Sequence, residues 1–394
     1  SFSKILSGDI EPEAKYPAAW SWVLALLILS SFASDEGAAS SSDQDFQKTI
    51  SSLKQLGVLP ANNLRDLVVY SSKKQFKIKI PPIMEALFES PVPQTQDLQF
   101  FHMIDNLKSL IGNFKSNNKH LVVVDGLDDI LTNRNIQLRS LASLMLEVSR
   151  LNQFFIKKNA PVKIIVLCRT ELFEKLPGPN KNKMRQDSAI EIDWYHDPRN
   201  PSNSKLVTLA NLRAKLSLGR EVNIFEDFFG ESIDGKKTLT FLIEMTRHTP
   251  RDFLQILTHL QKYYKSGKFA RDEVLSGCRD YSMNYFLPEI KDELVGYVSQ
   301  DHIEYIIQIF SSLRKRDFYM HEIEEIARSK PRYREMDIED ICIELFNCSA
   351  LGNVSKRPGG SEEFSFKYRN HNSSFNDRER IILHKGLWKA LNLI

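Results

Sequence analysis

Residues 120–131, HLVVVDGLDDIL, constrain the fold of this chain more than any other stretch. Four apolar, mostly β-branched residues run directly into Asp125, and two further carboxylates follow at Asp128 and Asp129. A short, wholly apolar run is typical of a strand buried on both faces, as in a parallel sheet. Open α/β sheets bind their ligands at the carboxyl edge of such strands. The pattern therefore predicts a central parallel strand whose acidic end faces a ligand.

The three carboxylates of this stretch allow two interpretations. Clustered carboxylates are costly to bury unless a cation offsets them, and Mg²⁺ on a nucleotide phosphate is the usual cation. The alternative is a core strand that ends in a polar turn, with Asp128 or Asp129 capping the next helix. We favour the metal–nucleotide site because the three carboxylates fall within five positions.

Further strands are predicted on both sides of this run. Residues 75–80 alternate and end at two prolines, residues 162–168 are wholly apolar, and residues 189–194 alternate again. A long amphipathic helix at residues 135–153 separates the first two apolar strands. Strands that alternate with helices predict an α/β fold with a doubly wound, largely parallel sheet.

From residue 206 onward the pattern is mostly helical. The predicted helices cover residues 206–218, 225–229, 239–245, 250–264, 270–287, 302–313, 320–327, 338–346 and 381–393. Two strands, at residues 351–354 and 363–368, are joined by a basic, glycine-rich turn. Three helices followed by a hairpin are the layout of a winged helix.

Residues 16–34 carry no charged side chain and are about long enough to span a bilayer. Four serines dilute this stretch, and Pro17 suits the first turn of a helix. We therefore expect a buried core helix, with a membrane helix as the alternative. The four cysteines are scattered, which predicts apolar core residues in a reducing, cytoplasmic compartment. A net charge of +3 is too balanced to imply a nucleic acid or membrane partner.

The DGLDD sequence resembles the Walker B motif of bacterial P-loop ATPases, especially the STAND class and its Orc-like and AAA+ relatives. The resemblance implies ATP and Mg²⁺ as cofactors, with Asp125 contacting Mg²⁺ through water and Asp128 or Asp129 polarising the attacking water. It also implies three domains. These are a P-loop NTPase-type parallel sheet core at residues 1–205, a helical lid at 206–295 and a winged-helix-like domain at 296–394.

Two arginines extend the resemblance. Arg169 directly follows the second apolar strand, as at the sensor-1 position, which implies contact with the γ-phosphate. The alternatives are an ion pair with Asp125 or Asp128, or an exposed Arg169 beside a helix-capping Thr170. The sequence HTPRD resembles the sensor-2 motif at the start of a lid helix, with His248 in place of the usual glycine. This implies that Arg251 binds nucleotide phosphates. A surface pair with its neighbouring carboxylate is the alternative.

A third arginine lies in the basic loop predicted at residues 176–185. Arg185 could act in trans in an oligomer, as an arginine finger does, although a solvated run of charges is the favoured interpretation.

The phosphate-binding pattern G-x-x-x-x-G-K-[ST] does not occur before Asp125. The nearest match, GESIDGKK at residues 230–237, follows about a hundred residues later and is interpreted as a surface turn. In the ATPases that the chain resembles, a central strand of the sheet leads into this loop. A sheet without that strand would leave backbone groups unpaired. We expect this strand and loop to precede Ser1, because the chain does not begin with Met; a degenerate ATPase fold is the alternative.

Together these features predict an ATP-binding, ATP-hydrolysing switch of STAND/Orc-like type, a group that often serves in antiviral defence. Nucleotide state would control domain movement and an effector, with a protein partner or a homo-oligomer as the expected assembly. DNA is not favoured, because the helix at residues 338–346 is acidic, and a membrane is not expected. The alternatives are a DNA-dependent initiator or remodelling ATPase, and a nucleotide-independent scaffold.

Overall fold

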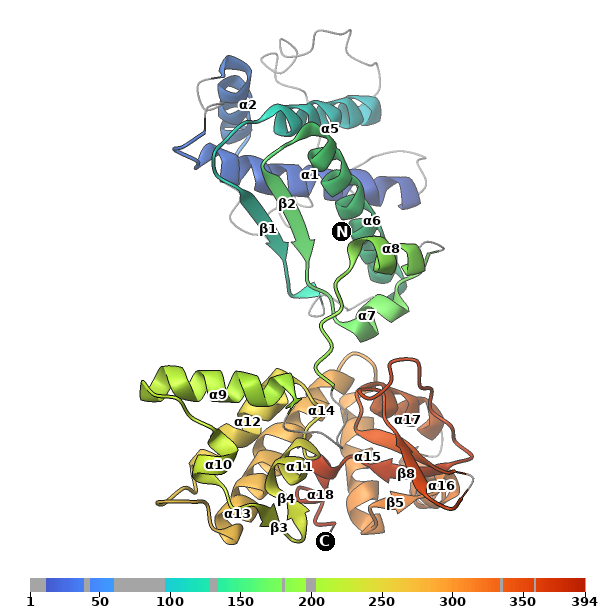
Figure 1. Ribbon diagram of the computed structural model, residues 1–394. Coiled ribbons are helices and arrows are strands. Elements are labelled where there is room, and N and C mark those ends of the chain that lie inside the picture. The colour runs from blue at the N-terminus through green and yellow to red at the C-terminus, as the bar shows by residue number, and fades with distance from the viewer. Residues whose placement is uncertain are drawn as a thin grey trace. The chain divides into compact units, whose positions relative to one another are not determined.

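The computed structural model describes residues 12–38, 43–59, 96–127, 134–178, 181–195, 203–333, 336–357 and 359–393. The chain divides into two compact units, residues 1–190 and 191–394, and each has its own hydrophobic core (Figure 1). The predicted lid and winged-helix-like regions both lie in the second unit and share one core. Their separation into two domains stays a prediction.

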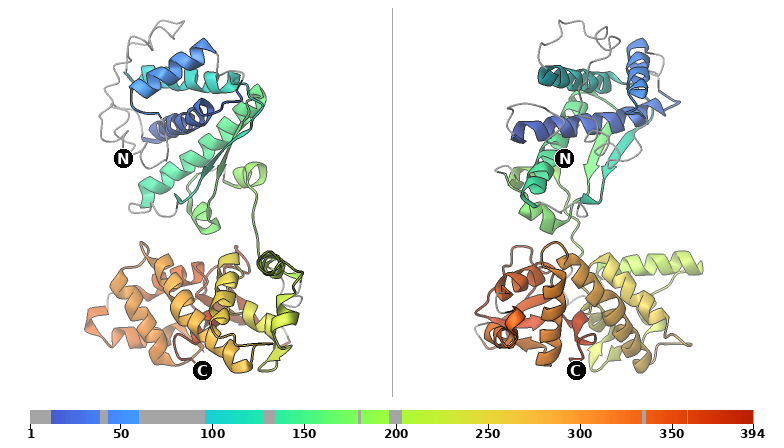
Figure 2. Two further views of the ribbon diagram at one scale, coloured as in Figure 1. Left: turned by 90° about the vertical axis from the view of Figure 1, so that its left-hand side faces the viewer. Right: turned by 180° about the vertical axis from the view of Figure 1, so that it is seen from behind.

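Helices of the first unit pack around α1 (Pro12–Ala33), which contacts α5 and α6 (Figure 2). Its segment Tyr16–Ala33 is long and apolar enough to cross a membrane, and 72% of it is buried inside the protein. The prediction of a buried core helix is confirmed, although Pro17 lies inside the helix and not in its first turn. The other helices of this unit are α2 (Gln44–Gln55), α5 (Gln96–Asn113), α6 (Arg134–Lys158), α7 (Thr170–Lys175) and α8 (Lys181–Ser188).

The predicted parallel strand pair is present. β1 (His120–Val124) pairs in parallel with β2 (Val162–Val166), with Val124 opposite Val166, and α6 connects the two strands. One face of the pair packs on α1 and α6. The other face is open: Leu121 is 58% and Val123 51% exposed. The prediction that β1 is buried on both faces is therefore wrong, because helices of the described part of the chain cover only one side.

Residues 189–194 are a second correction. They adopt no regular secondary structure, and Ile190 and Ile192 are 92% and 74% exposed. Alternation favours a strand only where a neighbouring strand and an apolar layer receive it. Within the described residues no strand pairs with this segment, and both isoleucines face solvent. The loop predicted at residues 176–185 is also wrong in part, since α8 begins at Lys181. The strand predicted at residues 75–80 lies outside the described residues.

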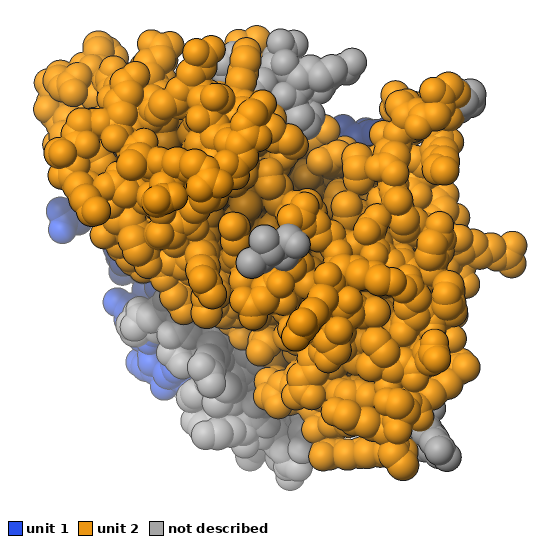
Figure 3. Space-filling view, turned by 90° about the horizontal axis from the view of Figure 1, so that it is seen from below, with its two compact units in different colours: residues 1–190 blue, residues 191–394 orange. Residues whose placement is uncertain are grey.

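The second unit, residues 191–394, is largely helical, as predicted. Figure 3 shows this unit in orange. The predicted helix at residues 270–287 is in fact longer, because α13 continues through a π-helical turn into α14, with Pro288 tolerated in the first turn of α14. The helices are α9 (Lys205–Leu218), α10 (Ile224–Phe228), α11 (Thr238–Ile243), α12 (Pro250–Gln261), α13 (Arg271–Tyr281), η5 (Ser282–Phe286), α14 (Leu287–Leu294), α15 (Gln300–Leu313), α16 (Met320–Arg328), η6 (Pro331–Tyr333), α17 (Ile338–Asn347) and α18 (Lys385–Trp388).

The second unit also contains a four-stranded sheet, with the order β5-β8-β6-β7. Its strands are β5 (Asp317–Phe318), β6 (Leu351–Lys356), β7 (Glu362–Ser365) and β8 (Arg380–Leu383). The closing helix predicted at residues 381–393 is therefore wrong at its start. Ile381 and Leu383 are buried in β8 between two antiparallel neighbours, and the helical part of this segment is the short α18.

The GESIDGKK sequence forms a small antiparallel hairpin of β3 (Ser232–Ile233) and β4 (Lys236–Lys237). Asp234 and Gly235 both have positive φ angles, 50° and 77°, as a two-residue hairpin turn requires. A phosphate-binding loop instead runs from a strand into the N-terminus of a helix. The segment is a surface turn, as predicted.

Candidate functional site

The carboxyl edge of β1 presents Asp125 to solvent. Its Oδ1 accepts a hydrogen bond of 2.8 Å from the backbone N–H of Gly126, whose φ of 74° is easily reached only by glycine. Leu127 follows and is 1% exposed, so it anchors the chain to the core directly after the turn. The carboxylate is thus held at the strand end by its own backbone while remaining accessible.

The chain leaves β2 at the same edge. Leu167 donates a 2.8 Å hydrogen bond from its backbone N–H to the carbonyl of Val124, which continues the parallel pairing beyond the strands. Arg169 comes two residues later, is exposed, and begins α7 as its N-terminal cap. Asp125 and Arg169 therefore lie at the shared carboxyl edge of neighbouring strands. The phosphate contact and the ion pair considered for Arg169 both stay predictions.

The metal site predicted at Asp125 is incomplete in the described part of the chain. Asp128 and Asp129 lie outside the described residues. Among the residues that are described, no three His, Cys, Asp or Glu side chains come close enough to hold a metal ion. Mg²⁺ binding at this edge stays a prediction.

Arg185 lies on α8, where an acidic side chain from α7 engages it. Its guanidinium forms an ion pair with Glu174 and stands 5.3 Å from the ring centre of Phe173. Lys181 forms a second ion pair with Glu174 at 3.1 Å. Hydrogen bonding from Arg185 lowers the pKa of Glu174, against the opposing effect of burial. These contacts lie within one chain, and a role of Arg185 in trans stays a prediction.

The HTPRD segment opens α12 as its residues predict. Thr249 caps the helix by accepting a 3.1 Å hydrogen bond from the N–H of Asp252, and Pro250 is the first helical residue. His248 has a φ of 57°, in the left-handed region that favours glycine. The glycine of the sensor-2 motif therefore corresponds to a position where the backbone is left-handed. His248 adopts this conformation at some cost in strain.

Arg251 points outward from the first turn of α12. Its side chain is 66% exposed, and its Nη1 donates to Glu289 of α14 at 3.2 Å. The surface pair with Asp252, considered as the alternative, is wrong because Asp252 is buried and has another partner. Most of the Arg251 side chain is open to solvent, as contact with a phosphate would require.

The partner of Asp252 is Arg247, which the sequence motifs did not indicate. Its guanidinium donates to both Asp252 oxygens at 3.0 and 3.2 Å, and its Nη1 to both Glu293 oxygens at 2.8 and 2.9 Å. Burial opposes ionisation of Asp252, yet the charge and hydrogen bonds of Arg247 lower its pKa. A sequence signal existed: Asp252 shares a helix face with Ile256 and His259, all three buried, and a carboxylate on such a face needs a cation.

Partly buried polar contacts also join the predicted lid to the predicted tail. Arg247 donates to the carbonyl of Cys348 at 3.3 Å, and Lys385 forms a 2.8 Å ion pair with Glu244. Ser282 accepts a 2.9 Å hydrogen bond from the N–H of Ala390. The two regions are thus held together by charge and backbone contacts in addition to their shared core.

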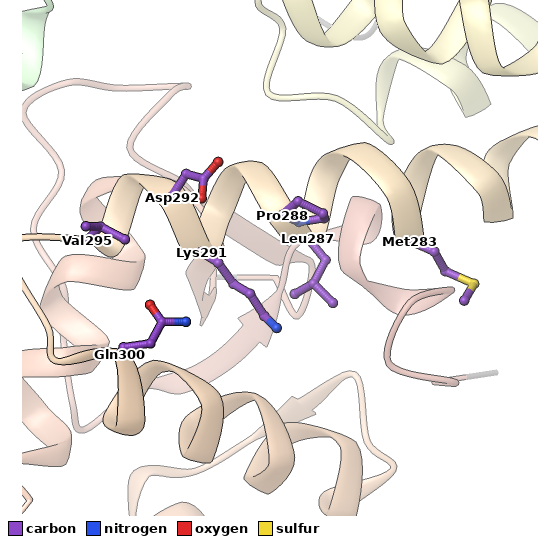
Figure 4. A pocket seen from close by; sticks show the side chains of 7 residues that line it. All are labelled: Met283, Leu287, Pro288, Lys291, Asp292, Val295 and Gln300. Carbon is purple, nitrogen blue, oxygen red and sulfur yellow. The ribbon is translucent and has the colours of Figure 1, made fainter. Parts of the chain in front are cut away.

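A shallow pocket lies between α14 and the first turn of α15 (Figure 4). It offers one cation and one carboxylate beside exposed apolar side chains, and none of the predicted site residues lines it. The lining residues are Met283, Leu287, Pro288, Lys291, Asp292, Val295 and Gln300.

Comparison with known proteins gives one partial match. Residues 204–287 match the FunZ-associated C-terminal helical domain. This segment is about a fifth of the chain and runs from the cap of α9 to the first residue of α14. It contains the HTPRD segment and the Arg247–Asp252 pair, but not the edge of β1 and β2. No curated protein and no solved structure matches the chain.

Proposed function

We propose that this chain is part of a nucleotide-dependent switch of the STAND/Orc-like P-loop ATPase type, with Mg²⁺-ATP at the carboxyl edge of β1 and β2. The observation that carries the proposal is the parallel pairing of the two strands, with Asp125 and Arg169 at their common edge. In the proposed site Asp125 holds Mg²⁺ through water, Asp128 or Asp129 polarises the attacking water, and Arg169 faces the γ-phosphate.

The free edge of β2 and the exposed face of the β1–β2 pair support this proposal. ATPases of this type place the strand that leads into the phosphate-binding loop beside the strand corresponding to β2. In the described residues β2 has β1 on one edge and no strand on the other. The uncovered face carries Leu121, Val123, Ile165 and Leu167, which parallel sheets normally bury. The proposal requires a further strand and phosphate-binding loop at this position.

Arg251 is the proposed link between nucleotide and the helical unit. Its present partner, Glu289, is 21% exposed and its own side chain is 66% exposed, so this ion pair is weak and exchangeable. A phosphate would compete for the same guanidinium with a bidentate, charge-assisted contact. Such exchange of partners is a physical means by which nucleotide state reaches α12 and α14.

For the C-terminal part we propose a winged-helix-like domain that docks on protein. The order α15, β5, α16, α17, β6 and β8, with β8 between β5 and β6, is that of a winged helix, with β7 added at the outer edge. The helix in the recognition position, α17, is capped by Asp337 and carries Glu339 and Asp340 in its first turn. These carboxylates repel DNA phosphates. In the wing, Arg357 is already paired with Glu363.

The test is ATP binding and hydrolysis by the full-length protein, with and without DNA. Asp125→Asn should abolish Mg²⁺-dependent hydrolysis, and Asp128→Ala or Asp129→Ala should lower the rate by at least about 100-fold. Asp193→Asn is the matched control, because Asp193 is also exposed and also accepts a turn hydrogen bond, from Tyr195 N–H at 2.8 Å. Hydrolysis that survives Asp125→Asn contradicts the proposed metal site.

The same assay separates the alternatives. Hydrolysis that depends on added DNA would favour an initiator or remodelling ATPase. Failure of the full-length protein to bind ATP would favour a nucleotide-independent scaffold. A cytoplasmic location and a defence role follow from the proposal and need their own tests in cells.

A further inference from the structure

A serine, a histidine and an aspartate form a continuous hydrogen-bonded array at the end of β1 opposite Asp125. Ser31 lies in the last turn of α1, Asp35 follows that helix, and His120 is the first residue of β1. The Ser31 hydroxyl is 2.8 Å from Nδ1 of His120, and Nε2 of His120 is 3.0 Å from Oδ2 of Asp35. Five residues of strand, about 16 Å, separate this array from the carboxyl edge.

The carboxylate is fixed and kept ionised. Asp35 accepts hydrogen bonds from the Ser116 hydroxyl at 2.6 Å, the Asn118 amide at 2.7 Å and the Gly37 N–H at 3.0 Å, in addition to His120. Its side chain is 3% exposed. The hydrogen bond from Ser116, followed by that from Asn118, lowers the pKa of Asp35, so it remains a charged acceptor.

This carboxylate decides which nitrogen of His120 carries the proton. A carboxylate can only accept, so Nε2 of the neutral ring is the N–H donor and Nδ1 is the free base. The Ser31 hydroxyl therefore donates to Nδ1. The ring is held edge-on to Phe32 at 4.7 Å between centroids, and its side chain is 8% exposed, so its orientation is set by packing. Ser31 itself is exposed.

A neighbouring serine shows that this geometry is not the default for the end of a helix. Ser34 is also exposed, and its hydroxyl donates to the carbonyl of Ser30 at 3.1 Å, four residues back. Helical serines commonly bond in this way. Ser31 instead turns its hydroxyl to an oriented imidazole, which is the relation between nucleophile, base and orienting carboxylate found in acyl-transfer sites.

The geometry points to Ser31 as a nucleophile that accepts an acyl group from activated esters. Its Oγ forms a bond to the carbonyl carbon, and the bond from that carbon to the ester oxygen breaks. The hydroxyl proton passes to Nδ1 of His120 and then to the departing aryloxide, which leaves as a phenol. Asp35 is a positioning residue that holds the imidazole in the required tautomer.

The helix limits the substrate class. Backbone N–H groups up to Ala33 are used within α1, so Ser31 lacks the pair of backbone donors that stabilises an oxyanion at a helix N-terminus. Activated esters need this stabilisation less than amides do, because their leaving group departs readily. We therefore expect transfer from aryl esters and no cleavage of peptide bonds.

The experiment treats the full chain with p-nitrophenyl acetate and maps acetylated serines by mass spectrometry. Ser31 should be acetylated about 100-fold or more faster than Ser34, which is the range that a positioned general base supplies. His120→Gln keeps a donor toward Asp35 but removes the base, so acetylation of Ser31 should fall to the rate of Ser34. Equal acetylation of Ser31 and Ser34 in the unaltered chain would overturn the inference.

A second pair of variants guards against misfolding. Ser31→Cys and Ser34→Cys place a thiol at each position, and the rate of alkylation by iodoacetamide reports its activation. We expect faster alkylation at position 31, with the difference lost when His120→Gln is added. A positioning role for Asp35 predicts slower acetylation in Asp35→Asn and partial recovery in Asp35→Glu. Alkylation rates that are equal at both positions would count against the array.

Discussion

Removing the guanidinium of Arg247 should destabilise the second unit far more than removing that of Arg251, four residues away. Arg247 and its partner Asp252 are 8% and 1% exposed, whereas Arg251 is 66% exposed in its pair with Glu289. Taking one partner from a buried ion pair costs about 3–5 kcal/mol, because a charge is left without compensation. An exposed pair contributes at most about 1 kcal/mol.

These magnitudes translate into measurable shifts. For a unit of this size about 1 kcal/mol corresponds to roughly 2–4 °C, so Arg247→Ala should lower the unfolding temperature by about 10 °C. Arg251→Ala should change it by no more than about 4 °C. Hydrogen exchange of α12 and α14 amides, followed by mass spectrometry, assigns the loss to the second unit. A loss in Arg247→Ala no larger than that in Arg251→Ala would refute the reasoning.

The pH dependence gives an independent check. Burial opposes ionisation of Asp252, but Arg247 lowers its pKa below that of an unfolded chain, about 3.9. Its stabilising contribution is therefore complete above that pH and is lost as pH falls through the folded value. Without Arg247, burial raises the pKa of Asp252, so acidification neutralises its uncompensated charge. The difference in unfolding free energy between Arg247→Ala and the unaltered protein should therefore shrink as pH falls. Adding Asp252→Asn to Arg247→Ala should restore stability at pH 7; no restoration would contradict the uncompensated-charge explanation.

Three further predictions follow from individual positions. Limited proteolysis should cut first near Ile190 and Ile192, which are exposed and outside regular structure, and leave two folded fragments; a first cut within β1 would contradict this. His248→Asn should keep the left-handed backbone but lose the 5.1 Å stacking on Tyr368, lowering the unfolding free energy by about 1 kcal/mol in urea titration. Gly277→Ala should cost more than about 1 kcal/mol by the same assay, because its Cβ would lie 2.7 Å from the Leu260 Cα.

Local sequence patterns predicted those elements whose own residues, independently of distant neighbours, require a buried position. The apolar runs at β1, β2 and α1 are long enough and uniform enough to need a core, and the structure buries α1 and one face of the β1–β2 pair. The cap at Thr249 and the glycine-like turn at His248 also follow from backbone requirements that act over a few residues. These signals located Asp125 and Arg169 at one edge, although two of the carboxylates lie outside the described residues.

Other elements depend on neighbours that a local pattern does not contain. Residues 189–194 and β8 both alternate or carry β-branched residues, yet the first is irregular and the second is an inner strand. The difference is that β8 has β5 and β6 beside it. Their paired residues lie 26 or more positions earlier in the chain, the nearest being Val354 opposite Arg380. Arg247 was missed for a related reason, because its partners Asp252 and Glu293 are brought together by the packing of α12 and α14.

The polar contacts between the predicted lid and tail also limit where the proposed switch can move. Rotation between the predicted lid and tail would break the Arg247 bond to the Cys348 carbonyl, the Lys385–Glu244 pair and the Ser282 bond to Ala390. Several of these groups are buried, so separating them costs several kcal/mol before any apolar surface is exposed. Residues 203–393 should therefore respond to nucleotide as one rigid body, and a nucleotide-driven hinge belongs before residue 203. We therefore expect ATP binding to change hydrogen exchange in the full-length protein only in segments before residue 203 and at the Arg251–Glu289 pair.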